Sequence, residues 1–509
     1  MSIDLRELLL APRLAPERVA GLLAPYGLKD FHKADANLQS SAGKPDERLL
    51  LAEILDDLMV CVAASADPDQ ALIRFERFTA ATNKAHLFTY LRNSKQAINI
   101  LAKILGGSAY MAEILIRDPH HFYWVVESHI LNRIRTKAEI RRDVRPTLLM
   151  LDEEEKQLDF LRAVKRREML HIGVRDLLRL ATVEETNAAL SFLGEALISS
   201  TCEVSAAALK RTWQIPPKMF RLFTVLAMGK LGGGELNFSS DVDLMFVYSS
   251  NAEQVPTISA PDYFRRLAQK ITAGLTSFTG EGYIYRVDLR LRPEGSAGNI
   301  ADTLDGFERY YRTRIGAWER LALLKAWPVA GSRLLGRRFL AMSRRFIYEP
   351  EFDVHALNEV REMKARMDEK ILARGQTDRN VKLGRGGIRE IELVVQTLQA
   401  THGTRLPEIL GRGTLPALAR LREHKLIPDQ DSDELHHAYL FLRDVENKLQ
   451  MVDDAQTHSL PQDREALMAC ARLLGYSASQ TESAIDPFLR DLQRHTNNVH
   501  RIFERVVGS

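Results

Sequence analysis

Two aspartates separated by a single residue carry the clearest chemical signal in the chain. Asp241 and Asp243 lie in the segment S-S-D-V-D-L, and the apolar run Leu244 to Tyr248 follows at once. Because side chains alternate between the faces of a β-strand, the two carboxylates project together while Val242 turns into the core. Adjacent carboxylates repel each other unless a cation neutralises them. The expected cation is Mg²⁺ or Mn²⁺, since hard ions favour oxygen ligands.

A third candidate carboxylate, Asp288, lies further along the chain. The stretch Tyr283 to Pro293 reads Y-I-Y-R-V-D-L-R-L-R-P, and its alternation predicts a strand that places Asp288 among arginines on one polar face. Three carboxylates can hold two divalent metals roughly 3.5–4 Å apart, an arrangement that stabilises both oxygens of a phosphoryl or nucleotidyl displacement. We predict that Asp241 and Asp243 bind both metals. Asp288 is expected to bind the catalytic metal and to act as the general base if one is needed.

A glycine-rich turn precedes the paired aspartates. Gly229, Gly232, Gly233 and Gly234 follow the apolar run Phe223 to Met228, which predicts a first buried strand. Glycine lets a backbone bend tightly or approach a ligand. The turn therefore supplies candidate phosphate contacts, and the polar face around Asp288 supplies two more. These candidates are Gly232, Gly233, Ser239, Ser240, Arg290 and Arg292, although the two serines can equally cap the turn.

Helical patterns surround this unit on both sides. Leu72, Phe75 and Phe78 recur at helical steps before it, and Ala356 to Ala373 reads as one long helix after it. The segment Lys382 to Gly387, K-L-G-R-G-G, predicts a turn that opens a helix near Ile388. Its backbone and Arg385 can bind an anion there; the alternative is a tight connection between domains, with Arg389 in a structural ion pair.

These patterns predict an α+β fold that is predominantly helical. A small mixed β-sheet forms the catalytic core, with a helical domain before it and a helical bundle after it. The predicted boundaries are 1–205 for the N-terminal helical domain, 206–335 for the core and 336–509 for the C-terminal bundle.

The combination of motifs is familiar. G-K-L-G-G-x-E-L-N-F-S-S-D-V-D-L, followed by V-D-L-R-L-R-P-x-G, resembles the glutamine synthetase adenylyltransferase/deadenylylase family of the nucleotidyltransferase superfamily. Later segments agree with this resemblance. They are W-E-R-L-A-L-L-K-A from Trp318, K-L-G-R-G-G-I-R-E-I-E from Lys382 and D-A-Q-T-H-S-L-P from Asp454. The similarity runs from about residue 70 to the end.

The resemblance implies a substrate and a reaction. Proteins of this family transfer AMP from ATP to a tyrosine of glutamine synthetase, or remove it by phosphorolysis and release ADP. The sequence N-F-S-S-D, Asn237 to Asp241, is more similar to the N-terminal, deadenylylating core than to the C-terminal one, which usually reads G-Y-x-S-D. We therefore expect AMP removal, with adenylyl transfer as the alternative. The sequence does not distinguish a stand-alone deadenylylase from half of a two-core protein.

The resemblance also bears on partners and on two further residues. Glutamine synthetase, ATP or ADP, and phosphate are the implied partners, and a PII-type nitrogen-signalling protein is a further candidate. Arg320 and Lys325 become candidate phosphate contacts through the resemblance alone, because surface arginines and lysines are usually only solvated.

Composition restricts the alternatives. The formal net charge is +3, and no basic, aromatic-rich stretch is present, so an RNA-directed nucleotidyltransferase is disfavoured and no nucleic-acid partner is expected. A non-catalytic regulatory scaffold is disfavoured by the three intact aspartates.

Cys61, Cys202 and Cys470 match no zinc spacing. The start, M-S-I-D-L-R-E-L-L-L-A-P, lacks the features of a signal peptide, and no run reaches bilayer length. We expect a cytoplasmic protein without a membrane partner.

Overall fold

The architecture was taken from a computed structural model that describes residues 4–251, 258–348, 352–373, 375–376, 379–479 and 481–508. The chain forms two compact units, and each is discontinuous in sequence. The first unit comprises Met1–Arg133, Arg167–Thr182 and Asn447–Arg490; the second comprises Ile134–Arg166, Val183–Glu446 and Asp491–Ser509. Helices α12, α22 and α24 contribute residues to both units. The three-part division 1–205, 206–335 and 336–509 stays a prediction.

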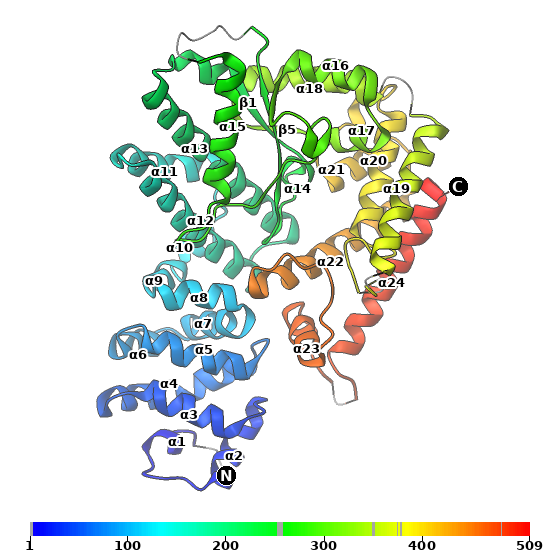
Figure 1. Cartoon of the computed structure of the whole chain (residues 1–509). Coiled ribbons are helices and arrows are strands. Elements are labelled where there is room, and N and C mark those ends of the chain that lie inside the picture. Colours follow the sequence, from blue (N-terminus) through cyan, green and yellow to red (C-terminus); the bar gives the residue numbers. More distant parts are fainter. Residues whose placement is uncertain are drawn as a thin grey trace. The chain divides into compact units, whose positions relative to one another are not determined.

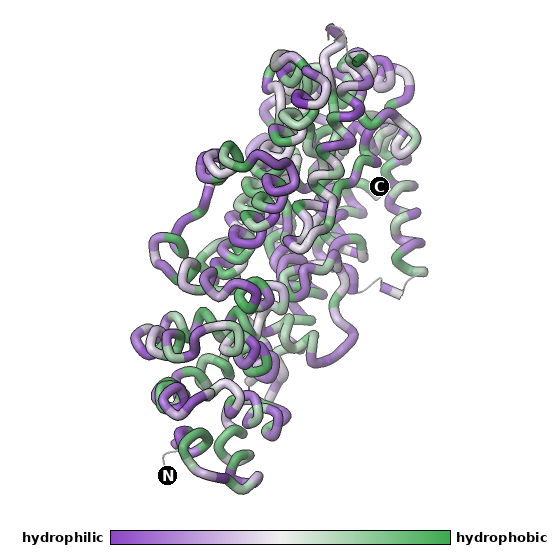
Figure 2. Tube along the Cα trace, turned by 60° about the vertical axis from the view of Figure 1, so that its left-hand side comes forward, coloured by the Kyte–Doolittle hydropathy of each residue, from purple (hydrophilic) through white to green (hydrophobic). Residues whose placement is uncertain are grey.

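The named secondary-structure elements of the first unit are all helices within the part of the chain that the structure describes (Figure 1). Polar side chains start its helices: the carboxylate of Asp67 and the hydroxyls of Ser94 and Ser108 accept hydrogen bonds from the first turns of α5, α7 and α8. Hydrophobic and hydrophilic residues alternate along these helices (Figure 2), which is the pattern of amphipathic packing. The helices are α1 Glu7–Leu10, α2 Pro16–Leu23, α3 Phe31–Ala42, α4 Pro45–Ala63, α5 Pro68–Ala80, α6 Lys84–Arg92, α7 Lys95–Gly107, α8 Ala109–Arg117, α9 His120–Val125, α10 Ser128–Leu131 and α23 Arg464–Leu473, with parts of α12 Glu154–Leu177, α22 Asp429–Asp453 and α24 Ile485–Phe503.

The second unit contains a small mixed sheet. Its strands are β1 Phe223–Ala227, β2 Val242–Tyr248, β3 Val287–Asp288, β4 Ala301–Thr303 and β5 Trp327–Gly331. The main path is β3-β2-β1-β5, and β4 also pairs with β2. β1 is antiparallel to β2 and β5, whereas β2 is parallel to β3 and β4. The predicted class, an α+β fold that is predominantly helical around a small mixed sheet, is confirmed.

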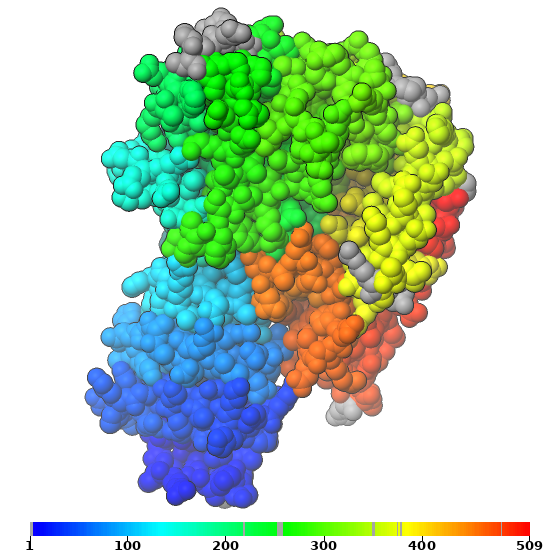
Figure 3. All heavy atoms as spheres, viewed as in Figure 1, coloured from blue at the N-terminus to red at the C-terminus, as the bar shows by residue number. Residues whose placement is uncertain are grey.

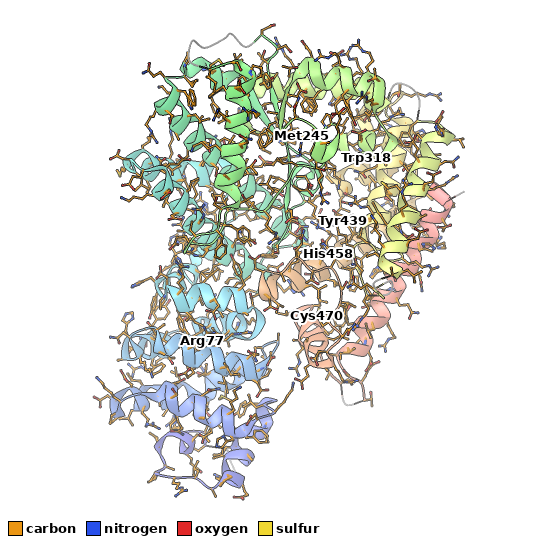
Figure 4. The ribbon with its side chains drawn as sticks, in the orientation of Figure 1. Arg77, Met245, Trp318, Tyr439, His458 and Cys470 are labelled. Atoms are coloured by element: carbon orange, nitrogen blue, oxygen red, sulfur yellow. The ribbon has the colours of Figure 1, made fainter. Side chains whose placement is uncertain are left out.

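Both faces of the central strands are covered by helices, which explains why β1 and β2 are continuous apolar runs. On one face, Leu226 and Met245 pack with residues of α16, α17 and α18; Met245 is labelled in Figure 4. On the other face, the rings of Phe223 and Tyr248 stack on Phe264 of α15, at centroid distances of 5.8 and 4.6 Å. The carboxylates of Asp241 and Asp243 have the parity of Met245 and therefore continue the first face.

The remaining helices of the second unit surround this sheet and extend beyond it (Figure 1). They are α11 Lys137–Met150, α13 Val183–Trp213, α14 Gly229–Gly233, α15 Ala260–Thr276, α16 Leu304–Arg314, α17 Ala317–Leu323, α18 Arg333–Tyr348, α19 Val354–Leu372, α20 Ile388–His402 and α21 Thr414–Glu423, with the other parts of α12, α22 and α24. Short 3₁₀ turns lie at Ala24–Tyr26, Pro217–Leu222, Gly295–Ala297 and Pro407–Ile409, and a π-helical turn at Glu504–Gly508.

The third strand is much shorter than the sequence alternation suggested. Ile284 and Tyr285 are both buried, so the expected alternation of one polar and one apolar face fails there. The backbone N–H of Arg290 donates to Asp288 Oδ1 at 2.8 Å, so the chain turns directly after Asp288 instead of continuing the ladder. Strand pairing in this stretch is therefore restricted to Val287–Asp288.

Among the residues that the structure describes, one helix, α13, is long and apolar enough to span a membrane by length and composition alone. However, 72% of its most apolar window is buried inside the protein. This burial identifies α13 as a core helix of the second unit.

Candidate active site

The pairing of β2 with β3 brings two of the three predicted carboxylates together. Val242 pairs with Val287 and Asp243 pairs with Asp288 in parallel register, and the N–H of Val242 donates to Arg286 O at 2.9 Å. Paired residues of neighbouring strands project from the same face of a sheet. Asp243 and Asp288 therefore stand side by side, while Val242 is fully buried in the core as expected.

Asp243 has the most perturbed environment of the three. Its carboxylate has no hydrogen-bond or ion-pair partner within the described part of the chain. Burial raises the pKa of Asp243 to about 6, helped by the neighbouring charges of Asp288 and Asp241 and opposed by Lys382 and Arg389. Gly229 adopts φ +53°, and a Cβ at this position would lie 2.5 Å from Asp243 Oδ2. Only glycine leaves room for this carboxylate beside the turn.

The other two carboxylates are held by arginines. Arg286 Nε donates to Asp241 Oδ1 at 2.7 Å, and its Nη2 donates to Ser239 O at 2.8 Å. Arg290 Nη2 pairs with Asp288 Oδ2 at 2.5 Å, and this hydrogen-bonded pair lowers the pKa of Asp288. In this arrangement, no three metal-ligating side chains among the described residues converge closely enough to hold an ion.

The donor chemistry nevertheless fits a divalent cation. Asp243 offers a partly buried carboxylate without a partner in the described part of the chain, directly beside Asp288. The side chain of Arg290 is 78% exposed, so its ion pair with Asp288 contributes little stability and opens readily. Carboxylate oxygens are the ligands that Mg²⁺ and Mn²⁺ favour. Asp241, Asp243 and Asp288 are therefore the residues that would hold such an ion.

The glycines and serines of the turn have structural reasons for their identity. A Cβ on Gly232 would lie 2.0 Å from Lys325 O, and one on Gly233 would lie 2.9 Å from Glu235 Oε2. Ser239 is buried and accepts from Arg286 through both its carbonyl and its hydroxyl; the hydroxyl of Ser240 donates to Asn237 Oδ1. Close packing of the turn thus accounts for these residues, and their contact with phosphate stays a prediction.

The predicted cationic phosphate contacts fall into two groups. Arg290 is next to the carboxylates, whereas Arg292 bonds to the carbonyl oxygens of Leu289 and Gly298. Arg320 is buried and donates to Ile347 O at 2.7 Å. Lys325 lies just beyond α17, and its buried ammonium group binds Glu235 and Glu392 at 3.0 and 2.7 Å. The structure thus gives Arg320 and Lys325 protein partners, and their role in phosphate binding stays a prediction.

Two cations near Asp243 were not among the predicted site residues. Lys382 and Arg389 both act electrostatically on Asp243. Lys382 is half-buried, and its ammonium group has no ion pair or hydrogen bond in the described ranges. Arg389 Nη1 pairs with Glu392 at 3.2 Å, which confirms the structural ion pair considered for this arginine. The sequence signal for these two cations was the segment K-L-G-R-G-G-I-R-E-I-E. The sequence alone does not show that this segment lies near Asp243.

Buried ion pairs attach the glycine turn to the helices that follow the sheet. Lys230 Nζ binds Asn237 Oδ1 at 2.9 Å and Glu446 Oε1 at 2.7 Å, and Glu446 also pairs with Arg443 at 2.5 Å. Burial lowers the pKa of Lys230 well below its usual range. The turn that positions Asp243 is therefore fixed from α22. Tyr439 of the same helix is labelled in Figure 4.

The sequence is similar to known proteins over most of its length. The profile of the glutamate-ammonia ligase adenylyltransferases matches residues 98–342, and that of the GlnD PII-uridylyltransferases matches residues 361–507. A bifunctional glutamine synthetase adenylyltransferase/adenylyl-removing enzyme of Thioalkalivibrio sulfidiphilus is 37% identical over 80% of this chain and 42% of its own length. The chain belongs to this family of nucleotidyltransferases.

Other members of the family agree. The enzyme of the same name from Vibrio parahaemolyticus is 38% identical over 68% of this chain and 37% of its own length. That of Brucella melitensis is 34% identical over 88% of this chain and 46% of its own length. The chain thus spans less than half the length of the family members it matches.

Proposed function

We propose that the protein removes AMP from an adenylylated tyrosine of glutamine synthetase by phosphorolysis. The observation that carries this proposal is the direct pairing of Asp243 with Asp288 beside the glycine turn. The family supports glutamine synthetase as the protein substrate, because the relatives are bifunctional adenylyltransferases and adenylyl-removing enzymes of that protein. The N-F-S-S-D sequence favours the removing direction, and adenylyl transfer from ATP is the second candidate.

The reaction balances without a covalent enzyme intermediate. An oxygen of inorganic phosphate attacks the phosphorus of the AMP group, the bond from phosphorus to the tyrosyl oxygen breaks, and ADP forms. The proton of the attacking phosphate passes to the tyrosyl oxygen. Asp288 is the candidate that relays this proton, because it is the more exposed of the paired carboxylates and its pKa is kept low by Arg290.

The chain's own cations would bind and orient the two phosphate groups. Lys382 and Arg389 approach Asp243 closely enough to influence its ionisation, and Arg290 stands at Asp288. Holding attacking and reacting groups in line supplies much of the rate in phosphoryl transfer. A divalent ion at Asp241, Asp243 and Asp288, when bound, would neutralise phosphate charge. Cytoplasmic location and regulation by a PII-type protein are further parts of this proposal; the PII-uridylyltransferase match over residues 361–507 supports the latter.

The direction of the reaction can be tested by comparing adenylylated with unmodified glutamine synthetase. The protein is incubated with AMP-tyrosyl glutamine synthetase, Mg²⁺ and phosphate, and ADP is measured; unmodified glutamine synthetase with labelled ATP is the parallel reaction. We expect ADP in the first and no incorporated label in the second. Incorporation of AMP without formation of ADP would reverse the direction, and Asp243→Asn serves as the inactive control in both reactions.

A further inference from the structure

A cationic hollow lies in the second unit, near the opposite edge of the sheet from Asp288. It has a volume of about 660 Å³ and is bounded by α11, by Ser200 and Glu203 of α13, and by the start of α18. We call it the α11–α18 hollow. Lys137 of its lining donates to Val329 O of β5 at 2.8 Å. β5 and β3 are at opposite ends of the strand order, so the hollow is separate from the paired carboxylates.

The lining of the α11–α18 hollow is strongly basic. Five cationic side chains contribute to it against one acidic residue; the five are Lys137, Arg141, Arg142, Arg145 and Arg333. Three of them have protein partners: Lys137 pairs with Glu195, Arg141 with Glu203 and Arg142 with Asp143. Arg145 and Arg333 are exposed and have no ion pair or hydrogen bond among the residues that the structure describes. The hollow thus keeps two uncompensated positive charges.

Large apolar side chains border the same surface. Leu149 lines the hollow and is 76% exposed; Met150 and Leu334, next to lining residues in the sequence, are 80% and 56% exposed. In Figure 3 the α11 segment, in cyan, lies on the surface of the face shown. Exposed leucine and methionine beside arginine are typical of a surface that another protein covers.

The chemistry of the lining favours a protein segment over a nucleotide. No aromatic side chain lines the hollow, so a nucleobase would find no ring on which to stack. The large apolar side chains at the hollow are mostly exposed to solvent, whereas small-molecule sites bury most of their ligand's surface. Uncompensated arginines beside leucines instead complement a segment that carries carboxylates and large apolar residues.

We infer that the α11–α18 hollow docks an acidic segment with large apolar side chains, belonging to the protein on which this enzyme acts. The identity of that protein as glutamine synthetase rests on the proposed function. A protein substrate offers much more surface than its modified tyrosine, and a second contact far from the reacting atoms increases affinity without touching the chemistry. The hollow then determines recognition of the protein, and the carboxylate site determines the reaction.

The test separates docking from catalysis. The affinity for immobilised adenylylated glutamine synthetase is measured at low and high salt, and turnover is measured with that protein and with a short AMP-tyrosine peptide. The test variant is Arg145→Glu/Arg333→Glu. The control is Arg338→Glu/Arg344→Glu, which makes the same charge change at two exposed positions of α18 outside the lining.

For the test variant we expect Kd and KM for glutamine synthetase to rise about tenfold, with a weaker dependence on salt, because close like charges replace attraction by repulsion. We expect no change in the turnover of the short peptide, in kcat with glutamine synthetase or in the melting temperature. The control variant is expected to shift Kd less than about twofold. Leu149→Ser is expected to raise Kd about threefold without altering the salt dependence, since it removes only apolar contact.

Equal Kd values for the test and control variants would overturn the proposed docking site. So would failure of the wild-type protein to bind adenylylated glutamine synthetase. If the wild-type protein binds but forms no ADP from the short peptide, the proposed reaction fails while the binding comparison still decides the role of the hollow.

Discussion

At the scale of single residues, the site depends on a carboxylate that the fold destabilises. Burial and the neighbouring charge of Asp288 raise the pKa of Asp243 to about 6, above the usual 3.8. Between these pH values the folded protein binds more protons than the unfolded chain. Its free energy of unfolding therefore falls as pH rises through this window, and the loss is complete above about pH 6. A bound cation would remove this cost, which links stability to the proposed chemistry.

Asp243→Asn should stabilise the protein while abolishing its activity. The pKa difference, at about 1.36 kcal/mol per unit, corresponds to about 3 kcal/mol of stabilisation at pH 7.5 as an upper bound. We expect a higher melting temperature at pH 7.5, little change at pH 4, and a decrease of at least about a hundredfold in the proposed AMP removal. Asp305→Asn, at an exposed position of α16, is the control and should change neither property appreciably. Lower stability of Asp243→Asn at pH 7.5 would contradict the destabilised carboxylate.

Binding of Mg²⁺ should depend on pH in the same window. Because protons compete with the cation for Asp243, the affinity measured by calorimetry is expected to fall about tenfold between pH 7 and pH 5. An ordinary carboxylate with the usual pKa of 3.8 would be fully ionised at both values and would give a flat profile. A flat profile in the wild-type protein would therefore show that Asp243 is not a ligand.

At the scale of elements, ion pairs between buried side chains stabilise the connection between β1 and β2. Lys325 lies between Glu235 of the turn and Glu392 of α20, and all three side chains are almost fully buried. Burial lowers the pKa of Lys325, but the two glutamates raise it above its ordinary value, so the ammonium group keeps its charge. For Glu392, burial favours the neutral form, yet Lys325 and Arg389 hold its pKa well below the usual range.

Removing Lys325 should destabilise the protein strongly. Lys325→Met leaves Glu235 buried without its cation and Glu392 with Arg389 alone, a change that costs about 3–5 kcal/mol in comparable buried pairs. The triple variant Lys325→Met/Glu235→Gln/Glu392→Gln should recover most of this loss, because no buried carboxylate is left without a cation and Arg389, which loses Glu392, is one-third exposed. Denaturant unfolding measures both, with Lys210→Met, an exposed lysine of α13, as the control. Equal stability of Lys325→Met and the wild-type protein would contradict a charged buried cluster.

The elements also explain which parts of the site the sequence could predict. Alternation around Asp241, Val242 and Asp243 was informative because β2 is regular and buried on both faces. β5 carries Pro328, and its pairing with β1 shifts register between Val225 and Leu226 of β1. Both features suit an edge strand and make the sequence of β5 unlike that of a central strand. Lys382 and Arg389 approach Asp243 because of how α20 packs, and no local sequence pattern predicts that packing.

At the scale of the whole molecule, the sheet that carries the candidate site depends on helices that precede it and follow it in the sequence. Lys137 of α11 pairs with Glu195 of α13, which also lies 3.5 Å from Arg412, and Lys230 of the turn pairs with Glu446 of α22. Lys137 also donates to Val329 O of β5. Segments before residue 206 and after residue 335 therefore both contact the residues between them. The second unit accordingly contains parts of all three predicted domains.

A fragment of residues 206–335 should therefore not fold alone, although it contains all three aspartates. Without α20, α21 and α22, Lys230 loses its carboxylate partner Glu446, Glu235 loses Thr414, and Lys325 keeps Glu235 but loses Glu392. Each unpaired buried charge costs several kcal/mol, while a whole domain is stable by only about 5–15 kcal/mol. We expect no cooperative thermal transition in circular dichroism, and soluble complex only when segments 1–205 and 336–509 are co-expressed. A cooperative transition of the isolated fragment near the melting temperature of the full chain would show that these buried pairs do not determine its stability.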